Sequence, residues 1–107
     1  MNRKTRLTEP RRGTYDPEPL ATDQVSLPPE LASLVERLAR NAHELWAAER
    51  IRTGWTYGPR RDDAARTTPW LVPFDQLPDD EQTIDSVMAT QTVKAILALG
   101  YRIERRE

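Results

Sequence analysis

The chain of 107 residues has no cysteine, one histidine and one phenylalanine, and these scarcities exclude several kinds of site. Without cysteine there is no disulfide framework, no thiolate metal site and no cysteine nucleophile. A zinc site would have to combine the lone imidazole of His43 with carboxylates, so we expect no metal centre. A lone histidine near a tryptophan, here Trp46, is more typical of a hydrogen-bonded structural residue.

Long apolar runs and an excess of either charge are also missing. No stretch approaches the roughly 20 apolar residues of a membrane span, and the basic N-terminus lacks the apolar core of a signal peptide. The chain has 16 Lys and Arg against 17 Asp and Glu, so it lacks the broad positive field of a nucleic-acid binder. We expect a cytoplasmic chain that engages no membrane and has little affinity for nucleic acid.

Prolines 10, 17 and 19 interrupt the first 26 residues, which contain few apolar side chains. We therefore predict a disordered tail at 1–26, an ordered domain at 27–103 and a charged end at 104–107. The tail carries a basic cluster typical of a solvated end, although an anionic partner could bind it. This cluster consists of Arg3, Lys4, Arg6, Arg11 and Arg12.

Apolar spacing predicts a first helix from Pro28 and Pro29 to Gly54, since proline suits a first turn and glycine follows a helix end. Its core stripe is expected at Leu31, Leu34, Val35, Leu38, Ala42 and Leu45. A second stripe follows at His43, Trp46, Ala47, Arg50 and Ile51. The helix is therefore expected to cover neighbours on two sides toward its end.

A second helix is predicted between Pro78 and Gly100, with three acidic residues in its first turn. Its core stripe is expected at Ile84, Val87, Met88, Gln91, Ala95, Ala98 and Leu99. Its last turns, which include Val93, Ile96 and Leu97, are expected to be buried on nearly every side. Residues 101–103 alternate as in a short strand.

Residues 55–80 are too rich in proline for a helix and too aromatic for disorder. The predicted fold is therefore mostly α (α+β), with two main antiparallel helices joined by a long ordered aromatic and Pro-rich loop containing short β-strands. No nucleophile elbow, phosphate loop or paired-histidine motif is present. Only Glu44, Asp62 and Asp63 suggest acid–base chemistry, so we predict no catalytic residue and no cofactor.

Aromatic and cationic residues gather along the first helix and the loop that follows it. Trp46 and Arg50 are one turn apart, and Trp55, Tyr57 and Arg61 come next. Indole rings beside guanidinium groups suit a planar anionic ligand such as an adenine nucleotide. Alternatively, the two tryptophans pin the loop to the helix and the arginines cover them through cation–π contacts.

Several motifs in succession resemble the ryanodine-receptor repeat, or RyR domain, in the single-copy form found in prokaryotic and phage proteins. They are NAHELW at 41–46, GWTYGP at 54–59, RDD at 61–63, PWLVPF at 69–74 and TVKAILALGY at 92–101. Together they span roughly 27–103. The resemblance implies two main helices with short strands, and a detached regulatory or binding module rather than channel activity.

The resemblance also implies an adenine-nucleotide-like ligand in an aromatic pocket. It points to Trp46 as the stacking surface, to Arg61 as a phosphate contact and to Trp55, Tyr57 and Gly58 as the turn that shapes the pocket. We add Arg50 and Lys94 as supplementary cations. Two departures, Thr68 for a usual histidine and Phe74 for a frequent tyrosine, each remove a polar contact and leave the ligand open.

Two hypotheses follow. The first is a non-enzymatic RyR-type module that senses a nucleotide or nucleotide-derived ligand through the aromatic and arginine pocket. The alternative is a protein-interaction or self-association module with no small ligand, in which the same aromatics form a homodimer interface that replaces the second repeat of a tandem pair.

Overall fold

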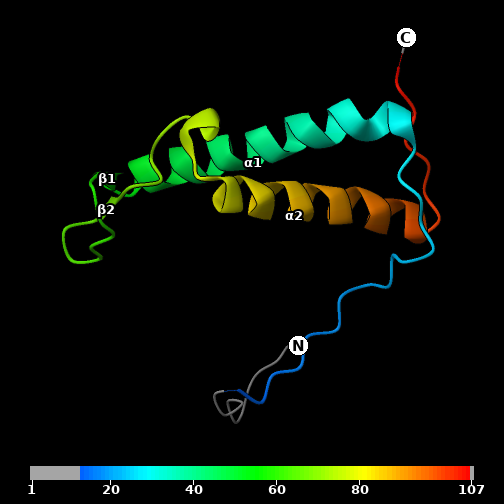
Figure 1. Cartoon of the computed structure of the whole chain (residues 1–107), viewed down its shortest axis with the longest axis horizontal. Helices are drawn as coiled ribbons and strands as arrows, with labels where there is room; N and C mark the ends of the chain where they lie inside the picture. Colours follow the sequence, from blue (N-terminus) through cyan, green and yellow to red (C-terminus); the bar gives the residue numbers. More distant parts are fainter. Residues whose placement is uncertain (1–12, 107) are drawn as a thin grey trace.

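The computed structural model describes residues 13–106, which form two long helices and a small loop region (Figure 1). A 3₁₀ turn, η1 (Pro29–Leu31), leads into helix α1 (Ala32–Arg52). Two short strands follow, β1 (Thr56–Tyr57) and β2 (Thr67–Thr68), and then a second 3₁₀ turn, η2 (Phe74–Gln76). Helix α2 (Asp79–Ala98) completes the element order. The prediction of two main helices and short strands is confirmed, and about half of the chain is helical.

The two helices lie side by side, and the chain runs along them in opposite senses in Figure 1, from cyan to green and then from yellow to orange. Proline begins both helical segments, at Pro29 in η1 and at Pro78 immediately before α2. Gly54, with φ +94°, provides the left-handed turn that ends α1. These helix boundaries are where the sequence places them.

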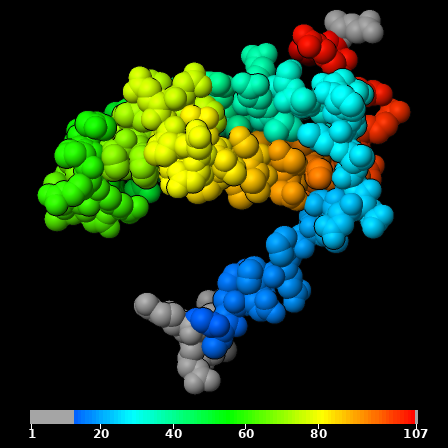
Figure 2. Space-filling model, viewed as in Figure 1, coloured from blue at the N-terminus to red at the C-terminus, as the bar shows by residue number. Residues whose placement is uncertain are grey.

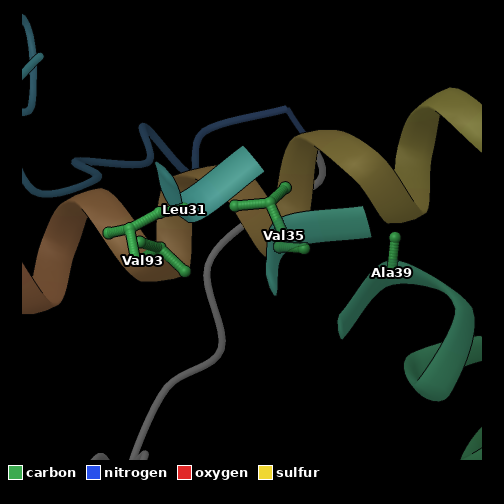
Figure 3. Close-up of a cluster of buried hydrophobic side chains, with 5 residues drawn as sticks. Leu31, Val35, Ala39 and Val93 are labelled. Carbon is green, nitrogen blue, oxygen red and sulfur yellow. The ribbon is translucent and has the colours of Figure 1, made fainter. Parts of the chain in front are cut away.

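The core between the helices is thin and built partly from small side chains. Leu31, Val35 and Ala39 of the first helical segment recur every four residues and meet Ala89 and Val93 of α2 (Figure 3). Ala39 and Val93 are each only 1% exposed. Because alanine has a short side chain, it lets the helix backbones approach closely, and the flanking leucines and Ile103 cover the edges.

The predicted core stripe of α1 is only partly correct. Leu31 and Val35 are buried, but Leu38, Ala42 and Leu45 face solvent, and Leu45 is 64% exposed. The buried line instead continues through Ala39 and His43. The reason is that neighbouring helices contact along rows spaced by four residues, whereas the prediction followed the largest apolar side chains.

The predicted stripe of α2 is wrong for most of its members. Ile84, Val87, Met88 and Leu99 are each at least half exposed, and the buried residues are Ala89 and Val93. The last turns are not buried all round either, since Ala98 is exposed. Residues 101–103 form no strand in the described chain; Ile103 instead packs against the core.

The chain preceding η1 leaves the helices at an angle (Figure 1). Thr22 is buried, and its hydroxyl donates a hydrogen bond of 2.7 Å to Oε1 of Gln91 on α2. The basic cluster predicted between residues 3 and 12 lies outside the described residues. Within residues 13–106, neither helix has the length and apolar character needed to cross a membrane.

The buried row of α1 can be tested by placing a leucine within it and, for comparison, another leucine on the exposed side of the helix. Ala39→Leu should lower the free energy of unfolding by about 1–3 kcal/mol, because the core has no room for the added carbons. Ala42→Leu, on the exposed side, should change it by less than about 0.5 kcal/mol. Urea unfolding measures both free energies. A larger loss for Ala42→Leu than for Ala39→Leu would instead support the buried stripe predicted from the sequence.

Candidate ligand-binding site

One face of α1 presents three side chains toward the loop. His43, Trp46 and Arg50 are spaced by three and four residues, so they lie along one side of the helix. His43 is 4% exposed, and its Nε2 lies 2.7 Å from the carbonyl oxygen of Val72. Since a carbonyl oxygen only accepts, Nε2 carries the proton and donates it. The hydrogen bond expected for this histidine is therefore present.

The imidazole also organises neighbouring rings. It stacks on Trp46, with centroids 5.6 Å apart and planes 23° apart, and meets Phe74 edge-on at 6.1 Å. Arg40 covers Phe74 with its guanidinium 5.0 Å from the ring centroid and pairs with Asp75 at 2.8 Å. The loop around η2 is thereby held against α1.

Past the end of α1, a tight turn brings Trp55 back over the helix. The Trp55 amide donates to the carbonyl of Arg50 at 2.9 Å, and Nη1 of Arg66 donates to the carbonyl of Thr53 at 2.6 Å. Gly54 has a φ of +94°, a conformation that side-chain-bearing residues rarely adopt, so this turn favours glycine.

The two strands pair in parallel, with Thr56 opposite Thr67 and Tyr57 opposite Thr68. Gly58 follows β1, and its amide donates to the carbonyl of Thr68 at 3.2 Å. A Cβ atom at Gly58 would lie 2.7 Å from Cβ of Thr67, so glycine is required for this close approach. Gly58 therefore shapes the turn, while its own atoms do not border the cavity described below.

Two arginines lie over the tryptophan rings. The Arg50 guanidinium is 5.6 Å from the ring centroid of Trp46 and 4.9 Å from that of Trp55. Arg61 approaches Trp55 at 5.5 Å, and its Nε donates to Oδ1 of Asp63 at 2.7 Å. That hydrogen bond and the Arg61 charge lower the pKa of the Asp63 carboxyl below its ordinary value.

These side chains border an open cavity of about 340 Å³. All three tryptophans of the chain line it, namely Trp46, Trp55 and Trp70. Its remaining lining consists of His43, Arg50, Arg61, Thr68, Leu77, Glu81, Ile84 and Asp85. The cavity thus collects residues from α1, from the loop and from the start of α2.

The cavity has walls of opposite charge. Arg50 and Arg61 provide the cationic side, whereas Glu81 and Asp85 project from the first two turns of α2. Neither carboxylate forms an ion pair with any group in residues 13–106. A ligand here would therefore meet both guanidinium donors and carboxylate acceptors.

Four of the seven predicted site residues meet at this cavity: Trp46, Arg50, Trp55 and Arg61. Tyr57 is 60% exposed and does not line it, and neither do Gly58 and Lys94. The sequence prediction missed Trp70 and the acidic wall. Trp70 lies within a motif already singled out, but nothing in the spacing of Glu81 and Asp85 indicates that the start of α2 would reach the cavity.

The candidate acid–base residues do not form a constellation. Asp63 is paired with Arg61, Oδ1 of Asp62 accepts the amide of Ala65 in a turn, and Glu44 is exposed on α1. Across the described part of the chain, no three His, Cys, Asp or Glu side chains are grouped so that they could hold a metal ion.

A comparison of the chain with known families identifies one of them. The family model of the RyR domain matches residues 15–105. The chain belongs to the RyR domain family. The two positions named above as departures from the RyR resemblance are both buried: Thr68 lines the cavity and its hydroxyl accepts the Trp70 amide at 3.3 Å, while Phe74 lies beneath Arg40 and meets His43 edge-on.

The anchoring role of His43 can be tested by replacing its donor. His43→Phe leaves the Val72 carbonyl without its partner and should lower the free energy of unfolding by about 1–3 kcal/mol. His43→Gln places an amide near the former Nε2 and should recover part of that loss. Urea unfolding of both variants measures these losses. If His43→Gln is no more stable than His43→Phe, the hydrogen bond does not anchor the loop.

Proposed function

We propose that this RyR domain is a non-enzymatic module that binds a nucleotide or nucleotide-derived ligand in the cavity between α1, the loop and α2. The observation that carries the proposal is the convergence of Trp46 and Arg50 from α1 with Trp55 and Arg61 from the loop around one open cavity of about 340 Å³. That volume lies within the range of small-ligand sites.

The chemistry of the walls fits the parts of a nucleotide. An indole face provides a stacking surface for a base, and such stacking contributes about 1–3 kcal/mol per base. Guanidinium groups fork toward phosphate oxygens. Glu81 and Asp85, which also line the cavity, offer acceptors for hydroxyl or amino donors, such as those of a ribose or an adenine.

The cation–π contacts of Arg50 also agree with the structural alternative, in which the arginines only cover the rings. The two interpretations differ in what happens to the cavity. A cover that served packing alone would close over the rings, whereas here the same rings and arginines border accessible space. This favours ligand binding over packing alone.

Intrinsic fluorescence tests the proposal directly, because every tryptophan of the chain borders the cavity. Titration with ATP, ADP, ADP-ribose and cyclic nucleotides should give a saturable change for at least one of them. Arg50→Gln should weaken binding of that nucleotide roughly 10- to 100-fold, since a hydrogen bond to a charged group contributes about 1.5–3 kcal/mol.

Lys94→Gln is the matched control, because it also removes one cation but lies outside the cavity. It should leave the affinity unchanged. Calorimetry with the same nucleotides checks that the fluorescence change reports binding. Flat titrations across the panel, or equal losses for Arg50→Gln and Lys94→Gln, would reject the proposed site.

A further inference from the structure

Two of the three tryptophans at the cavity already have partners for their rings. Trp46 is contacted from both directions along α1, by the His43 ring at 5.6 Å from one turn before and by the Arg50 guanidinium at 5.6 Å from one turn after. The Trp55 ring is contacted by two guanidiniums, that of Arg50 at 4.9 Å and that of Arg61 at 5.5 Å. A base that stacked on either ring would compete with these groups for its faces.

Trp70 lines the same cavity and differs from the other two. Its side chain is half-buried, and within residues 13–106 it takes part in no ring stacking and no cation–π contact. Its backbone is fixed, because its amide donates to the buried Thr68 hydroxyl at 3.3 Å and its carbonyl accepts the Val72 amide at 2.8 Å. An indole that is held by its backbone beside a cavity, with no partner for its ring, suits the stacking of a base.

The groups that line the cavity come from one end of the molecule. Figure 2 shows the loop, coloured green to yellow, beside the first turns of α2, coloured yellow. Trp70 belongs to the loop, and Glu81 and Asp85 project from those turns, one helical turn apart. One small ligand can therefore contact the loop and α2 together.

The charges that line the cavity are balanced, with two guanidiniums, Arg50 and Arg61, and two carboxylates, Glu81 and Asp85. Arg61 is already paired, since its Nε donates to Oδ1 of Asp63 at 2.7 Å. Arg50 has no ion pair in the described part of the chain, and neither carboxylate of the lining has one. A ligand would meet one cation without an acidic partner and two carboxylates that repel further negative charge.

We propose that the cavity binds a nucleotide with a single phosphate group, whose base stacks on Trp70 and whose phosphate contacts Arg50. Glu81 and Asp85 accept hydrogen bonds from the sugar hydroxyls and disfavour a second or third phosphate. The inference rests on the proposed function, which it narrows to one class of nucleotide and to one stacking ring.

Tryptophan variants test the stacking ring, with AMP as the probe and calorimetry as the measure of affinity. Trp70→Ala should weaken AMP binding roughly 5- to 100-fold, and Trp70→Phe, which keeps a ring, should recover most of the loss. Trp70→Phe should also remove most of the fluorescence change that AMP causes. Trp46→Phe, the matched substitution at a ring that already has partners, should retain that change.

The outcomes separate the two proposals. Binding of AMP to Trp70→Ala as tightly as to the unchanged chain would overturn the stacking on Trp70, and so would a full fluorescence change in Trp70→Phe. Either result would leave the proposed function in place, whereas a chain that bound no nucleotide would reject that function and this inference with it.

The charge of the ligand is tested with AMP and ATP, which share a base and a sugar. Without divalent cations, AMP should bind roughly 3- to 10-fold more tightly than ATP, because the added phosphates face the carboxylates of the lining. Tighter binding of ATP would overturn the assignment to a single phosphate.

Asp63 contributes to this selectivity through Arg61. Its pKa is lowered by the Arg61 hydrogen bond and charge and also by the Arg50 charge, so its carboxylate interacts with both guanidiniums. Asp63→Asn should reduce the preference for AMP over ATP roughly twofold to fivefold. Asp75→Asn is the matched control, because Asp75 is equally exposed and pairs at 2.8 Å with Arg40, outside the cavity. Equal effects of the two variants would show that Asp63 has no specific role.

Discussion

The hydrogen bond from His43 to the Val72 carbonyl is the constraint on which the site depends. The 26 residues between α1 and α2 contain only two strands of two residues and one 3₁₀ turn, too little regular structure to fix their own shape. Their position is set by contacts with α1, and from the middle of that helix His43 bonds to Val72 while Arg40 contacts Phe74 and Asp75. Its ring also contacts Trp46, which lines the cavity, and Phe74 of η2, so one buried imidazole positions both the loop and part of the cavity wall.

A second set of contacts acts at the end of α1. The Trp55 amide bonds to the Arg50 carbonyl, and the Arg50 guanidinium lies over the Trp55 ring. Backbone and side chain therefore link the same two residues. The helix end, the turn at Gly54 and the cavity wall form one unit, so the positions of Trp55 and Arg50 are set together rather than independently.

The sequence predicted the helices well and their buried faces poorly, for a physical reason. Helix ends depend on local signals such as Pro29, Gly54 and Pro78, which act within a turn of their own position. The buried face depends on the neighbour, and the two helices meet through Ala39 and Ala89. An apolar pattern is dominated by large side chains, so the prediction placed Leu45 and Met88 in the core, although both are exposed.

For the site, too, the sequence predicted what depends on local spacing and missed what depends on long-range packing. Trp46, Arg50, Trp55 and Arg61 are close in sequence, and helical spacing plus one turn was enough to group them. Glu81 and Asp85 reach the cavity only because the loop returns the chain to the start of α2, a long-range consequence that spacing does not encode.

Helix α2 packs against α1 on one side and carries exposed apolar side chains on the other, and Ile84 of the exposed side also lines the cavity. The apolar stripe predicted as core from the sequence lies on this exposed side, where residues up to Asp23 border Val87, Met88 and Gln91. Alanines at 39 and 89 bring α2 close to α1, and the larger residues of α2 are consequently left on its far side. The thin core and the exposed apolar side chains of α2 are therefore two results of the same choice of side chains.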